Sequence, residues 1–96
     1  MSDSAVVSRS YTVKLVNGLH LRPWMGFVKL TQKFKSKIDV VKEAARCDGR
    51  SMLSLLSLSA KCGDVVVIEA SGEDAEQAAA ALLEFLDTYV EVDEME

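Results

Sequence analysis

Segments with the period of a β-strand and segments with the period of an α-helix alternate along this chain, and this alternation restricts its fold more than any other feature. Apolar and polar side chains alternate over residues 11–16, which is typical of a half-buried strand. Trp24, Phe27 and Thr31 instead recur at the spacing of one helix face. The chain as a whole predicts strands at 11–16, 37–42, 44–47 and 65–68, and helices at 22–34, at 51–59 and over the alanine-rich stretch from 75 onward.

This β-α-β-β-α-β-α order predicts an α+β fold, an open-faced β-sandwich with a four-stranded sheet and the helices packed on one face. At 96 residues the chain has room for one domain with one core. We expect that domain at 10–90, between a flexible N-terminal segment at 1–9 and an acidic C-terminal tail at 91–96. The run Val65–Ile68 is β-branched throughout, which is typical of a buried strand.

Charge and composition exclude several classes of partner. The formal net charge is -4, whereas nucleic-acid binding relies on clustered Lys and Arg. No apolar run is long enough to cross a membrane, and residues 1–10 lack the apolar core of a secretory signal, so we expect a cytoplasmic protein. Cys47 and Cys62 form no Cys-x-x-Cys pair, which favours reduced, partly buried thiols over a metal site. A monomer is the default expectation.

One short segment, Asn17-Gly18-Leu19-His20-Leu21-Arg22-Pro23, combines three features that suit a phosphoryl group. Histidine changes charge near neutral pH, so the ring of His20 can offer a neutral nitrogen as a nucleophile. The segment joins a strand to a helix start, where backbone N–H groups and a partial positive charge favour anions. Arg22 adds a cation with several donors. Spacing alone leaves a structural role for His20 open, but a hydrolase is poorly supported because nothing else in the chain completes a site.

The same segment, continued by Phe27-Val28-Lys29, resembles the active-site segment of the HPr family, the phosphocarriers of the phosphoenolpyruvate-dependent sugar phosphotransferase system. A second segment, from Arg50 to Leu58, resembles the regulatory-serine helix of that family, and its distance from His20 agrees without a gap. A third resemblance runs from Gly63-Asp64 to Gly72-Glu73-Asp74-Ala75. Together they cover nearly the whole domain.

The resemblance implies a phosphoryl carrier with no cofactor, no metal and no independent turnover. His20 would accept a phosphoryl group from Enzyme I, which phosphoenolpyruvate charges, and pass it to a sugar-specific Enzyme II component of the A type. Arg22 would stabilise the phosphoryl oxygens, and the backbone N–H groups of Leu21 and Arg22 would bind them. Ser51, a reasonable helix N-cap in any case, would be the site of regulatory phosphorylation by a serine kinase and of dephosphorylation by a phosphorylase.

Partner proteins would meet an apolar surface beside the histidine, and helical apolar residues beyond those one core can bury predict such a surface. The residues expected there are Met25, Met52, Leu53 and Leu56. The family usually has small residues where this chain has Leu21 and Trp24, so we expect these bulky side chains to alter the docking surface. A second hypothesis follows: a regulatory module, as in nitrogen-related phosphotransfer chains, that docks on target proteins through this surface.

Overall fold

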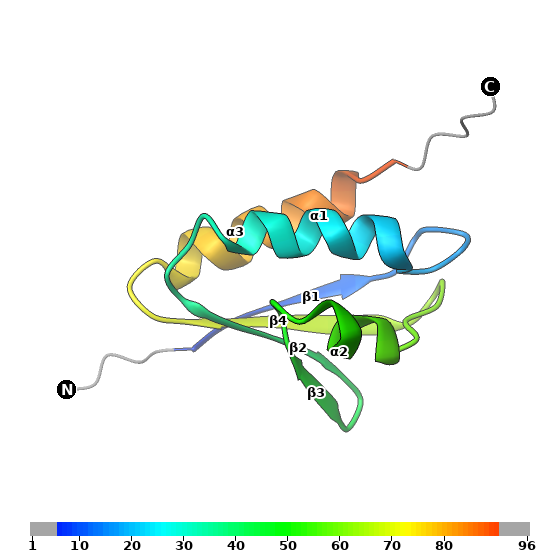
Figure 1. Ribbon diagram of the computed structural model, residues 1–96, viewed down its shortest axis with the longest axis horizontal. Coiled ribbons are helices and arrows are strands. Elements are labelled where there is room, and N and C mark those ends of the chain that lie inside the picture. The colour runs from blue at the N-terminus through cyan, green and yellow to red at the C-terminus, as the bar shows by residue number, and fades with distance from the viewer. Residues whose placement is uncertain (1–5, 91–96) are drawn as a thin grey trace.

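The computed structural model describes residues 6–90, and its helices and strands follow the predicted order (Figure 1). The strands are β1 (Val6–Thr12), β2 (Lys37–Lys42), β3 (Ala45–Asp48) and β4 (Val65–Ser71). The helices are α1 (Leu21–Thr31), α2 (Met52–Ser57) and α3 (Ala75–Thr88). The strands form one antiparallel sheet in the order β1-β4-β2-β3, so the predicted α+β class is confirmed.

The sheet is covered by helices on one face only. Figure 1 shows α1 and α3 lying side by side over that face, and Leu55 and Leu58 of α2 join the same core. Along β4 the side chains of Val66 and Ile68 are fully buried, while Val65 on the other face is 48% exposed. The run Val65–Ile68 thus forms a strand as predicted, but it is buried on one face only, because alternate side chains of a strand point to opposite faces.

The uncovered face of the sheet is stabilised by an ion-pair network across three strands. The guanidinium of Arg46 on β3 contacts the carboxylates of Asp39 on β2 and Glu69 on β4 at 3.0 and 2.7 Å. These two bonds, to Glu69 first and then to Asp39, raise the pKa of Arg46. The network lies on the solvent side and contributes modestly.

The first strand begins earlier than the sequence pattern predicts. Val6 pairs with Ser71 and Thr12 with Val65, so residues 6–9 belong to the sheet and not to a flexible N-terminal segment. The pattern missed them because Ser8 and Ser10 lie on the uncovered face, where no apolar side chain is needed. The strand also ends at Thr12 and not at Val16. Residues 1–5 and the acidic tail at 91–96 lie outside the described residues.

A carboxylate connects the start of α3 to the loop that follows α1. The side chain of Asp74 accepts hydrogen bonds from the backbone N–H groups of Lys35 and Ser36, both at 2.9 Å, and from the Ser36 hydroxyl at 2.5 Å. Such bonds are made to the ionised form. The Ser36 hydroxyl above all, with the Lys35 N–H, holds the pKa of Asp74 below its usual range.

This contact predicts a loss of stability in acid. Because the folded-state pKa of Asp74 lies below its unfolded value of about 4, the stabilisation is complete above that pH and is lost as the pH falls through the lower folded-state value. Urea midpoints of the wild type and of Asp74→Asn, measured from neutral pH downward, should converge below pH about 4. Asp64, whose pKa is lowered chiefly by the Lys61 N–H, contributes in the same direction. Parallel pH profiles of the two proteins would contradict the role assigned to Asp74.

Candidate functional site

The backbone in front of His20 is bound to the segment that precedes β4. Gly18 has a φ of +73°, and a Cβ at this position would lie 2.5 Å from the carbonyl oxygen of Ala60, so only glycine fits. The N–H of Leu19 donates to the same oxygen at 2.9 Å, and the Leu19 side chain is buried. These contacts hold the backbone on the N-terminal side of His20 in place and so fix the position of the histidine.

His20 is the N-cap residue of α1. Its backbone is extended, with φ -104° and ψ -160°, and its carbonyl oxygen accepts the first helical hydrogen bond, from the N–H of Trp24 at 3.2 Å. Pro23 has no N–H, which is tolerated in the first turn. The remaining amides of that turn belong to Leu21 and Arg22, and first-turn N–H groups of a helix point beyond its end, where they favour an anion.

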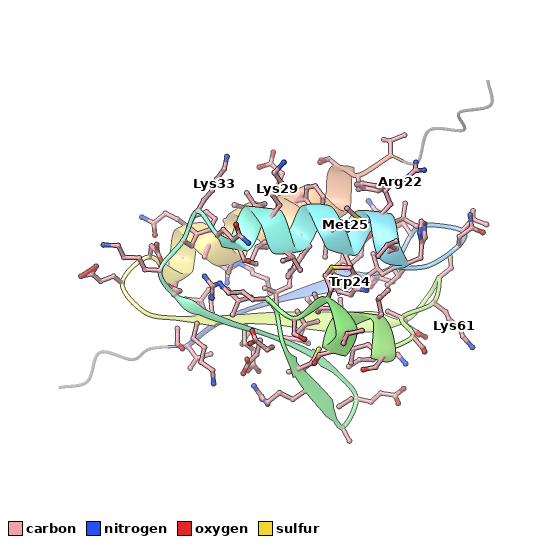
Figure 2. All side chains as sticks on the ribbon, viewed as in Figure 1. Arg22, Trp24, Met25, Lys29, Lys33 and Lys61 are labelled. Carbon is pink, nitrogen blue, oxygen red and sulfur yellow. The ribbon has the colours of Figure 1, made fainter. Side chains whose placement is uncertain are left out.

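The side chains at this helix start divide between surface and core. His20 is half-buried, and Arg22 is exposed at the N-terminal end of α1, where Figure 2 labels it. Leu21 is 53% exposed, so its apolar side chain adjoins the histidine on the surface. The structure thus places His20 and Arg22, the two residues that the sequence analysis selected, at the same end of α1. The planar guanidinium of Arg22 is a cation suited to binding phosphoryl oxygens.

Trp24 lies in the core and not on the docking surface. Its side chain is fully buried, and its ring meets that of Phe27 edge to face with the centroids 5.1 Å apart. Helix periodicity explains this position, because residues 24, 27 and 31 share one face, and all three are buried. The expectation that Trp24 alters the surface is therefore wrong, whereas Leu21 is placed to do so.

Ser51 is the N-cap of α2, as predicted. Its hydroxyl oxygen accepts a hydrogen bond from the N–H of Ser54 at 3.3 Å and lies 3.1 Å from the Ser54 hydroxyl. The side chain is half-buried at a helix start that contacts α1 through the packing of the two helices. A modification at Ser51 would therefore add charge beside the helix that carries His20.

Arg50 connects the start of α2 to the end of α1, a role that the sequence did not reveal. Its guanidinium donates to the carbonyl oxygens of Thr31 at 2.9 Å, Phe34 at 2.8 Å and Ser36 at 3.0 Å. These carbonyls belong to the last turn of α1 and to the loop that follows, where helical partners are missing. The only signal in the sequence is the residue type, a planar group with five donors.

Four apolar side chains are exposed on the two packed helices α1 and α2, and together we term them the apolar surface: Leu21, Met25, Leu53 and Leu56. Leu53 is 81% exposed and Met25 is 54% exposed. Met52, also expected there, is half-buried and packs against the core. Leu55 and Leu58 are buried.

Outside this region the described residues offer little further chemistry. Within residues 6–90 there is no group of three His, Cys, Asp or Glu side chains that could hold a metal ion. No helix in that part of the chain has the length and apolar character needed to span a bilayer. Burial, followed by Asp39 and Asp48, raises the pKa of the half-buried Cys47 thiol. Cys62 is exposed, contrary to the prediction that both thiols are partly buried.

The fold and the helix-start histidine agree with one known family. Residues 7–88 match the family described as the PTS HPr component phosphorylation site. The chain belongs to the HPr family. This identification confirms the resemblance carried by the segments around His20 and Ser51.

Individual relatives match along almost their whole length. The phosphocarrier protein HPr of Borreliella burgdorferi is 35% identical over 86 residues, which are 90% of this chain and all of that protein. The HPr-like protein Crh of Bacillus subtilis is 33% identical and covers 90% of this chain and 96% of its own. The crystal structure of HPr from Bacillus anthracis superimposes with a TM-score of 0.80 at 32% identity, covering 85% of this chain and 98% of that one. The chain is thus a phosphocarrier-family protein in sequence and in fold.

Proposed function

We propose that this HPr-family protein is a cytoplasmic, monomeric carrier that accepts a phosphoryl group on His20 and passes it on. The donor is Enzyme I charged by phosphoenolpyruvate, and the acceptor is a sugar-specific Enzyme II component of the A type. One observation carries the proposal: His20 is the N-cap of α1, directly before the amides of Leu21 and Arg22, in a chain that matches the family over residues 7–88.

This geometry supports a direct transfer between two histidine nitrogens. A neutral ring nitrogen of His20, the Nδ1 atom in the family's pattern, attacks the phosphorus as the bond to the donor's own nitrogen breaks. The transferring group is loose and spreads negative charge over its oxygens, so positioning and electrostatic stabilisation supply most of the catalysis. The Leu21 and Arg22 amides and the Arg22 guanidinium are the donors assigned to those oxygens. The reverse sequence delivers the group to the next protein.

Partner proteins are assigned to the apolar surface. Leu21 and Met25 are exposed on α1, the helix that begins after His20, and Leu53 and Leu56 are exposed on α2. Ser51 begins this second helix, so a phosphoryl group added there by a serine kinase would place negative charge beside the docking surface. Such a charge is tolerated locally at a helix start, and its effect falls on the partners that approach.

A second candidate function is a regulatory module that docks on target proteins and does not carry phosphate to a sugar component. Two observations support this candidate. Leu53, directly after Met52, is exposed, and the chain is similar to an HPr-like protein as well as to HPr itself. The regulatory module uses the same apolar surface on α1 and α2. The two functions differ in whether His20 is phosphorylated from phosphoenolpyruvate.

Mass spectrometry distinguishes the phosphoryl carrier from the regulatory module. Incubation with phosphoenolpyruvate and Enzyme I should add one acid-labile phosphoryl group to the wild type and none to His20→Ala. Arg22→Gln should slow the transfer by about 100-fold, as expected for removal of one donor from a transition state. Lys33→Gln, which removes a positive charge farther along the chain, should react at the wild-type rate.

The failure of the wild type to acquire the group, or an undiminished adduct on His20→Ala, would exclude the carrier function. Mass spectrometry also tests whether Ser51 is phosphorylated. With ATP and a serine kinase, an acid-stable adduct should appear on the wild type and not on Ser51→Ala, whose fold is checked by circular dichroism because the N-cap is worth about 1 kcal/mol.

A further inference from the structure

A groove of about 290 Å³ lies between α1 and α3. It is lined by Gly26, Leu30 and Phe85, with Lys29 and Lys33 as its charged members. A Cβ on Gly26 would collide with the ring of Phe85, so the two helices meet closely and Phe85 forms an apolar floor. Figure 2 shows Lys29 on α1 and Lys33 in the turn after that helix projecting toward the same side, and both are exposed.

The charge that complements these lysines is concentrated at the other end of the sequence. Residues 91–96 contain no Lys or Arg but have four carboxylates, Glu91, Asp93, Glu94 and Glu96. These four negative charges equal the whole formal net charge of -4, so residues 1–90 contain equal numbers of acidic and basic side chains. The same short segment also contains Val92 and Met95, which match an apolar floor.

The chain leaves α3 next to this groove. α3 ends at Thr88, and the ring of Tyr89 lies 5.6 Å from the ring of Phe85, the residue on the groove floor. Since α1 and α3 run in opposite directions, the path from Tyr89 back past Phe85 to Lys33 is about 16 Å at 1.5 Å per helical residue (Figure 1). Six extended residues span about 20 Å, so the segment reaches both lysines.

We propose that the acidic segment 91–96 binds in this groove of its own molecule, with its carboxylates beside Lys29 and Lys33 and its apolar side chains against Phe85. The bound segment neutralises the outer edge of α1. The apolar surface, made by Leu21, Met25, Leu53 and Leu56, is a separate set of residues and stays open to partners. The proposal goes beyond phosphoryl transfer and does not depend on it.

NMR of the uniformly ¹⁵N-labelled full chain, compared with a chain that ends at Val90, tests this contact without any phosphoryl donor. Removal of the segment should shift the amide signals of Gly26, Leu30 and Phe85, and leave those of β3 unchanged. Salt at about 1 M, where the Debye length is about 3 Å, should weaken the difference. A peptide of residues 89–96 should restore the shifts only at about millimolar concentration, because a short linkage gives an effective concentration of that order.

Matched lysine variants show whether the contact is specific. In the double variant Lys29→Gln and Lys33→Gln, truncation should no longer shift the groove signals. In the control Lys37→Gln and Lys61→Gln, which removes the same charge elsewhere, the shifts should persist. Three results would overturn the proposal: no shift on truncation, equal shifts in both double variants, or shifts that grow with protein concentration, which would place the segment on a second copy.

Discussion

Replacement of Trp24 by alanine is expected to lower the free energy of unfolding by about 3–5 kcal/mol, the usual cost of removing a large buried aromatic side chain. Trp24 is fully buried and is the largest side chain in the core, where its ring packs on Phe27. A domain of this size has a total stability of about 5–15 kcal/mol, so the variant should lose a large part of it. Denaturant unfolding followed by circular dichroism measures the change.

Two controls make this prediction specific. Among the described residues Trp24 Nε1 is buried without a hydrogen-bond partner, and an unpaired buried donor costs about 1–3 kcal/mol. Trp24→Phe removes this donor as well as part of the ring, so its net effect should be smaller than that of the alanine variant. Met25→Ala, at the neighbouring exposed position, should change stability by about 0.5 kcal/mol or less. An alanine variant at position 24 as stable as the wild type would show that the indole is not a core element.

Replacement of Arg50 by methionine is expected to cost about 2–4 kcal/mol, since three hydrogen bonds from a charged donor to backbone carbonyls are lost. Methionine retains much of the aliphatic chain, so the loss reports the guanidinium. Hydrogen exchange should show the effect first at the end of α1 and in the loop that follows, where the carbonyls of Phe34 and Ser36 lose the Arg50 donor and that of Thr31 keeps the N–H of Phe34.

Arg50→Lys tests whether geometry or charge matters at this position. A lysine keeps the positive charge but is not a planar fork, so it should recover only part of the stability. Full recovery would mean that charge alone is sufficient, and an unchanged Arg50→Met would contradict the structural role. Because Arg50 directly precedes Ser51, its contact also connects the α2 N-terminus to the helix that begins at His20.

The order of elements and most of the site could be predicted because they depend on local properties. Strand β2 has the predicted bounds, and Ser51 caps α2 as expected, since a hydroxyl at a helix start bonds within a few residues of chain. His20 and Arg22 stand out by residue type. The apolar period of 3.6 residues and the nearby Pro23 predict where α1 begins. That position lies directly after His20, so the candidate site at the helix start could be predicted as well.

The errors have a common physical origin in contacts between residues distant in sequence. Residues 6–9 form a strand because they pair with β4, some sixty positions away, and two serines on the uncovered face hide that pairing. Trp24 was expected to alter the docking surface because the family has small residues there, but its side chain is buried on the core face of α1. Arg50 gave no local sign of its three acceptors, which lie at the end of α1 and in the loop that follows.

The sequence by itself determined the order of strands and helices and the family to which the chain belongs, and it selected the candidate site residues, because periodicity, caps and residue types are encoded locally. Only the tertiary structure decided which face of the sheet is covered, that Trp24 is buried while Leu21 is exposed, and that Arg50 connects α1 to α2. The physical reason is that burial and long-range hydrogen bonds depend on elements that meet in space, and each pairing is selected by the packing of the whole core.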